Sequence, residues 1–144
     1  MESLKIPEQT DAAAENIKYA KAFVEFQYAE IKDFSKQFLT VVAGVLAVTV
    51  TFSEKIVNFA TASSVQRFLL MAVWCGCIIA FTLGGLAIVT IYDAGVVAKE
   101  TELDGKMRTY PELRLRSHRL LIAGGITFVL SLALLVVTGL IKAF

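Results

Sequence analysis

Three long runs of uncharged residues constrain this chain more than any other feature. They cover residues 37–53, 68–92 and 120–141, which are 17, 25 and 22 residues long. A helix needs about 20 apolar residues to cross the hydrocarbon core of a membrane, with a range of roughly 17 to 25. Lipid offers the backbone no hydrogen-bond partners, and the alternating pattern of a barrel strand is absent from these runs. We therefore expect three transmembrane helices.

The composition points in the same direction. Of the 144 residues, 56% are hydrophobic and 19% are charged. In soluble domains roughly half of the residues are hydrophobic and roughly a quarter are charged. The formal net charge is +1, so no excess of positive charge indicates nucleic acid as a partner. We expect an integral membrane protein rather than a soluble enzyme.

The predicted fold class is an all-α integral membrane protein with two regions. Residues 1–36 are expected to form a cytoplasmic amphipathic helix, and residues 37–144 a three-helix transmembrane domain. The expected spans cover about 37–57, 66–92 and 119–142, and the cytoplasmic loop 93–118 is expected to be helical. The interaction partner that follows directly is the lipid bilayer.

The N-terminal region has helical periodicity. Its apolar residues recur at steps of three and four, namely Ile17, Ala20, Val24, Tyr28, Ile31, Phe34 and Phe38. No Gly or Pro separates them from the first span, so we expect one helix from about Thr10 to Ser53. Its apolar stripe is explained by packing on the chain's own helices, by lying on the membrane surface, or by docking of another protein.

Local signals mark the other helix ends. Ser63-x-x-Gln66 and Thr109-x-x-Glu112 are capping boxes, which predict helix starts near Ser64 and Tyr110. Residues 103–106 contain Asp-Gly, which is typical of a turn.

The charges near the spans predict the orientation. Eleven of the 14 Lys and Arg residues lie before the first span or between the second and third, which three spans place on one side. The positive-inside rule assigns that side to the cytoplasm. The first 30 residues have no apolar signal-peptide core. We expect a bacterial inner-membrane protein with a cytoplasmic N-terminus and an outer C-terminus.

Small residues recur every four positions in the spans. The second and third spans contain the two series Ala72, Gly76, Ala80, Gly84 and Ala123, Thr127, Ser131. The first span has a shorter series at Thr40, Gly44 and Val48. Small residues on one ridge let helices approach closely. The ridges are therefore predicted to be a helix-packing face or the seam of a homo-oligomer, with a pore-lining stripe as a third interpretation.

A basic cluster precedes the third span. It consists of Arg108, Arg114, Arg116, His118 and Arg119. Basic residues at a membrane surface attract anionic lipid headgroups. We expect an anionic lipid or ligand patch here, and His118 as a haem ligand is the less favoured alternative.

No group of residues predicts catalysis. The single histidine has no partner set for nucleophilic chemistry, and no metal-binding or phosphate-binding motif is present. Cys75 and Cys77 are two residues apart on a helix, so they point about 200° apart and cannot share a metal. We expect no enzyme activity, no catalytic residues, no cofactor and no metal.

Two functions fit these expectations. The architecture resembles that of small bacterial membrane effectors and phage holins, which implies a self-assembling protein that alters membrane permeability or integrity, with its cytoplasmic helices sensing a partner or trigger. The alternative is a non-catalytic anchor or accessory subunit of a larger membrane complex. Ser117-His118-Arg119 is similar to residues of the three-span succinate dehydrogenase anchors, but a second haem-ligating histidine is missing.

Overall fold

The computed structural model describes residues 6–58, 61–104, 106 and 109–143. In these ranges every regular element is a helix, in the order α1 (Ile6–Ala22), η1 (Phe23–Gln27), α2 (Tyr28–Thr51), α3 (Ser53–Ile56), α4 (Ser64–Asp104) and α5 (Tyr110–Ala143). Three helical segments are long and apolar enough to cross a membrane, namely Ala12–Thr51, Ser64–Asp104 and Tyr110–Ile141. The prediction of an all-helical protein with three membrane-spanning candidates is confirmed.

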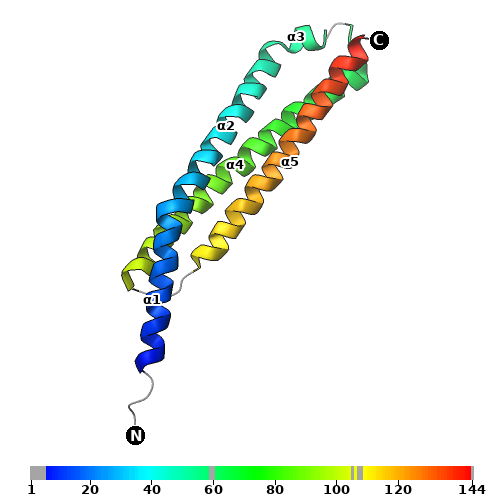
Figure 1. Ribbon diagram of the computed structural model, residues 1–144. Helices are drawn as coiled ribbons and strands as arrows, with labels where there is room; N and C mark the ends of the chain where they lie inside the picture. The colour runs from blue at the N-terminus through cyan, green and yellow to red at the C-terminus, as the bar shows by residue number, and fades with distance from the viewer. Residues whose placement is uncertain (1–5, 59–60, 105, 107–108, 144) are drawn as a thin grey trace.

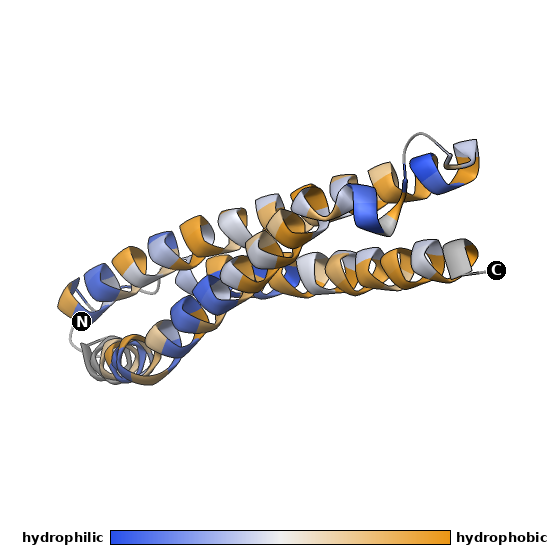
Figure 2. Cartoon of the chain, turned by 90° about the horizontal axis from the view of Figure 1, so that it is seen from above, coloured by the Kyte–Doolittle hydropathy of each residue, from blue (hydrophilic) through white to orange (hydrophobic). Residues whose placement is uncertain are grey.

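The long helices form an elongated bundle (Figure 1). The helix α4 is its central element, because it packs along α5 and also along α1 and α2. Both α2 and α5 run antiparallel to α4, so the N-terminal helix, the end of α4 and the start of α5 meet at one end of the bundle. Figure 2 shows that hydrophilic residues gather at this end. We call it the charged end, and it comprises residues 12–36, 93–104 and 110–119.

Two clusters of buried residues hold the bundle together. The first, in the uncharged part, contains Val42, Val73, Cys77, Ala80 and Phe128. The second, at the charged end, contains Ala20, Phe23, Ile91, Ala94, Ala98 and Tyr110. Because α4 contributes alanines to the second cluster, α1 can approach it closely enough for the aromatic rings to fill the remaining space.

The N-terminal helical segment differs in detail from the single α-helix that the sequence predicts. Its α-helical hydrogen bonding is interrupted by η1, a π-helical turn in which the Tyr28 N–H donates to the Phe23 carbonyl. The α-helix then ends at Thr51 rather than Ser53, and Phe52 leaves the helical conformation. A π turn inserts one extra residue and rotates the following side chains. Phe23, at the start of the turn, is a member of the second cluster, and Tyr28, directly after the turn, packs against the same cluster.

The ends of α4 and α5 follow local sequence signals. In the capping box before α4, the Ser63 N–H donates to Gln66 Oε1 at 3.0 Å and the Gln66 N–H donates to Ser63 Oγ at 3.3 Å. The helix α4 ends at Asp104, whose carboxylate accepts from the Lys106 N–H at 3.1 Å. The helix α5 begins at Tyr110, as predicted, and the Thr109 carbonyl accepts from the Glu112 and Leu113 N–H groups.

Candidate functional site

The predicted small-residue ridge of α4 faces two different neighbours. A Cβ atom added at Gly76 would overlap Ser131 Oγ and lie 3.3 Å from Ser131 Cβ, so Gly76 faces α5. A Cβ added at Gly84 would lie 2.8 Å from Leu39 Cδ2 and 3.0 Å from the Phe38 ring, so Gly84 faces α2. The structure therefore brings Gly76 and Ser131 together within one chain.

The remaining residues of the two series lie around this contact. Ala80 is fully buried in the first cluster, and Ala72 is half-buried. On α5, Thr127 is half-buried and donates to the carbonyl of Ala123, which is itself exposed. The close approach of α5 to α4 is completed by Gly124, where an added Cβ would lie 3.3 Å from the Ala80 carbonyl oxygen. Gly124 lies outside the four-residue series, and the only sequence signal for it is the Gly-Gly pair.

The basic cluster does not form one patch in the described part of the chain. Arg108 lies outside the described residues. Arg114, Arg116, His118 and Arg119 are all exposed on α5, but only Arg114 and His118 line the groove described below. Residues four apart share a helix face, whereas Arg116 is rotated about 200° from Arg114. The helical geometry therefore separates the two groove residues from Arg116 and Arg119.

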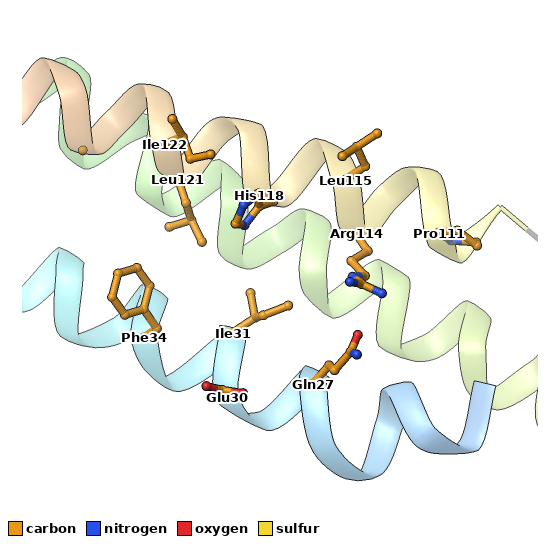
Figure 3. Close-up of a pocket in the computed structure, with 11 residues that line it drawn as sticks. Gln27, Glu30, Ile31, Phe34, Pro111, Arg114, Leu115, His118, Leu121 and Ile122 are labelled. Atoms are coloured by element: carbon orange, nitrogen blue, oxygen red, sulfur yellow. The ribbon is translucent and has the colours of Figure 1, made fainter. Parts of the chain in front are cut away.

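A groove with a volume of about 900 Å³ lies between α2 and α5. Its walls are formed by Gln27, Glu30, Ile31, Phe34, Pro111, Arg114, Leu115, His118, Leu121, Ile122 and Gly125. Figure 3 shows Arg114 and His118 pointing from α5 toward α2, and Gln27 and Arg114 pointing toward one another. Pockets for small molecules have volumes of roughly 300–1,000 Å³, so this groove is large enough for part of an amphiphilic ligand.

An aromatic contact lies beyond each end of the groove along the bundle axis. At the charged end, the ring centroids of Phe23 and Tyr110 are 5.5 Å apart. On the other side of the groove, the rings of Phe38 and Phe128 meet edge to face at 6.1 Å. These contacts hold the N-terminal helical segment against α5 on both sides of the groove, and between them the walls stay apart.

Tyr110 links the groove to the core of the charged end. Its side chain is 5% exposed. Burial raises the pKa of the Tyr110 phenol, and the neighbouring Arg114 guanidinium lowers it in part. The buried Tyr110 ring and the exposed Arg114 guanidinium thus lie close enough to interact electrostatically at the start of α5.

A buried hydrogen bond between helices was not predicted from the sequence. Ser117 is fully buried, and its hydroxyl donates to the Ala87 carbonyl oxygen of α4 at 2.9 Å. Most other buried hydroxyls bond to carbonyls of their own helix; Ser35, for example, donates to Ile31 at 2.7 Å. Ser117 therefore joins α5 to α4 through a side-chain hydrogen bond, on the turn of α5 that also carries Arg114 and His118.

Replacing Ser117 by alanine is expected to lower the free energy of unfolding by about 0.5–1.5 kcal/mol, the usual net contribution of one hydrogen bond. Thermal unfolding in mild detergent measures this change. Ser35→Ala is the matched control, because Ser35 is equally buried but bonds only within its own helix. Equal effects of the two substitutions would contradict a role for Ser117 in joining the helices.

Within the described residues, no three side chains of the metal-ligating types lie together. Comparisons of the chain with protein-family models, with curated proteins and with solved structures gave no match.

Proposed function

We propose that this protein is a small membrane protein that assembles with copies of itself and alters the permeability of the membrane. The observation that supports self-assembly is the outward face of α2. Thr40, Ala43, Gly44, Ala47 and Thr51 are all exposed there. A Cβ added at Gly44 would meet nothing within 4 Å.

This face differs from the ridges of α4 and α5. The small residues Gly76, Gly84 and Gly124 already contact neighbouring helices of the same chain. Close helix association in lipid depends on small residues that let two backbones approach. The α2 face is small, lies in the uncharged run and has no neighbour in the chain, so we place the seam between copies on α2.

The proposed topology follows from the charges. The charged end would lie in the cytoplasm with the N-terminus, and the C-terminus would lie outside, in the inner membrane of a bacterium. The N-terminal helical segment at the charged end would then be available in the cytoplasm to sense a partner or trigger. When copies assemble through α2, the transmembrane helices of the different copies would change their arrangement in the membrane, and this would alter its permeability.

Gly44→Leu is expected to convert an oligomer into a monomer, because the leucine would hold the α2 backbones apart. The mass of the purified protein in mild detergent and dye release from liposomes measure assembly and permeability. Gly139→Leu is the control, because Gly139 also has nothing within 4 Å of an added Cβ but lies on α5. A wild-type protein that is monomeric and releases no dye would contradict the proposal, as would an oligomer that Gly44→Leu leaves intact.

The second candidate function is that of a non-catalytic accessory subunit. It is favoured by apolar side chains that are exposed at the charged end, where no lipid would cover them. Tyr19 is 58% exposed, Phe26 71% and Leu103 87%. A stoichiometric second protein that remains bound in detergent, and is lost on Tyr19→Ser with Phe26→Ser, would favour this function over self-assembly.

A further inference from the structure

We propose that the groove between α2 and α5 binds one phospholipid whose headgroup carries a primary amine, as phosphatidylethanolamine does. This inference is independent of how the protein assembles. It rests on the two halves of the groove lining and on the charges of opposite sign that its two walls carry.

The lining changes from polar to apolar in the same direction on both walls. The half that carries the charges is lined by Gln27, Glu30, Arg114 and His118, together with the apolar Pro111 and Leu115 of α5. The apolar half consists of Ile31, Phe34, Leu121, Ile122 and Gly125. On α5 the change occurs at Arg119, the last charged residue before the uncharged run. The groove lining therefore changes from polar to apolar along its length, as a phospholipid does from headgroup to acyl chain.

The polar half offers charges of both signs. Arg114 and His118 on α5 supply N–H donors for a phosphate, and guanidinium–phosphate hydrogen bonds are among the strongest in proteins. Glu30 on the opposite wall supplies a carboxylate acceptor. Among the described residues, the structure gives neither Glu30 nor Arg114 an ion-pair partner. Both charges are thus free to bind the two opposite charges of one zwitterionic headgroup.

The kind of headgroup follows from Glu30. A primary ammonium has three N–H donors for the carboxylate, whereas the trimethylammonium of phosphatidylcholine has none. A headgroup that is only anionic, such as phosphatidylglycerol, would place its phosphate beside Arg114 but leave Glu30 without an opposite charge. The charges of the groove therefore favour an aminophospholipid over both.

The apolar half suits an acyl chain. Phe34 is 60% exposed and Ile122 50% exposed, so both apolar surfaces face outward from the bundle. Gly125 leaves the floor of this half open, because an added Cβ there would meet nothing within 4 Å. An acyl chain that comes from the surrounding lipid gains van der Waals packing on such a surface rather than removal from water.

Native mass spectrometry tests the proposal. Delipidated protein is mixed with equal amounts of phosphatidylethanolamine, phosphatidylglycerol and phosphatidylcholine, and the bound lipids are counted. We expect one bound phosphatidylethanolamine, retained about tenfold better than phosphatidylcholine, as the loss of one charged hydrogen bond predicts.

Glu30→Gln is expected to abolish that preference, and Arg114→Gln to weaken the retention of all three lipids. Asp33→Asn and Arg119→Gln are the controls, because each removes a similar charge outside the groove.

Gly125→Leu is the decisive variant. It fills the apolar half without a clash and should lower lipid retention about tenfold with little change in stability, whereas Gly139→Leu should change neither. Equal retention of phosphatidylethanolamine and phosphatidylcholine, a preference for phosphatidylglycerol, or unchanged retention in Gly125→Leu would each overturn the proposal. Dimers that Gly125→Leu dissociates would also overturn it, because they would show a second copy in the groove.

Discussion

Gly84→Leu is expected to destabilise the bundle strongly, whereas Gly85→Leu is expected to leave it intact. A Cβ at Gly84 would already lie 2.8 Å from Leu39 Cδ2 and 3.0 Å from the Phe38 ring, and a leucine would add three more carbon atoms. Overpacking of this kind costs about 1–3 kcal/mol and sometimes more. The loss should appear as a lower midpoint of thermal unfolding and as aggregated material in size-exclusion chromatography in detergent.

Gly85 is a matched control because it adjoins Gly84 in the same helix, yet a Cβ there would meet nothing within 4 Å. The two substitutions change composition, helix propensity and hydrophobicity equally, so only the packing differs. Equal unfolding midpoints for the two variants would show that α2 does not pack on α4 at Gly84. The double variant Gly76→Leu with Gly84→Leu should be less stable than either single variant, because a leucine at Gly76 would clash with α5 rather than with α2.

The same pair of glycines shows how far the sequence predicts this fold. The uncharged runs, the start of α5 and the capping box at Ser63 could be read directly from the sequence, because each depends on residues close together in the chain. The four-residue spacing also identified Gly76 and Gly84 as packing residues. It could not say that Gly76 faces α5 while Gly84 faces α2, because that depends on the angle at which α4 crosses its neighbours.

The groove could be predicted only in part, for a related reason. The sequence led to the prediction of a site for an anionic group at the basic cluster. It could not show that Arg114 and His118 line a groove together with Glu30 of another helix. That selection depends on the rotation of α5, to which the bond between Ser117 and Ala87 and the packing of α5 on α4 both contribute. The π turn at Phe23–Gln27 likewise has no Gly or Pro to mark it.

Phe23→Ala is expected to release α1 from the charged end while the rest of the bundle stays folded. Phe23 is 3% exposed, and its ring contacts Tyr110 and Tyr28 at centroid distances of 5.5 and 6.5 Å. Replacing a buried phenylalanine by alanine costs about 3–5 kcal/mol. Phe23 is the large buried side chain through which the N-terminal segment contacts Tyr110 of α5 in the second cluster. Amide hydrogen exchange over residues 12–22 should therefore become faster by about two orders of magnitude or more.

The control for this prediction is Phe26→Ala, one turn further along the same segment, where the side chain is 71% exposed. It removes the same atoms without opening a cavity, so exchange over residues 12–22 should stay slow. Trypsin provides a second measurement, because Lys18 and Lys21 lie in α1 and should be cleaved rapidly only when α1 is released. Slow exchange and resistance to trypsin in Phe23→Ala would mean that α1 is held by contacts other than the aromatic cluster.

Release of α1 would also remove the aromatic contact between Phe23 and Tyr110 at one end of the groove. Lipid retention should therefore fall in Phe23→Ala but not in Phe26→Ala.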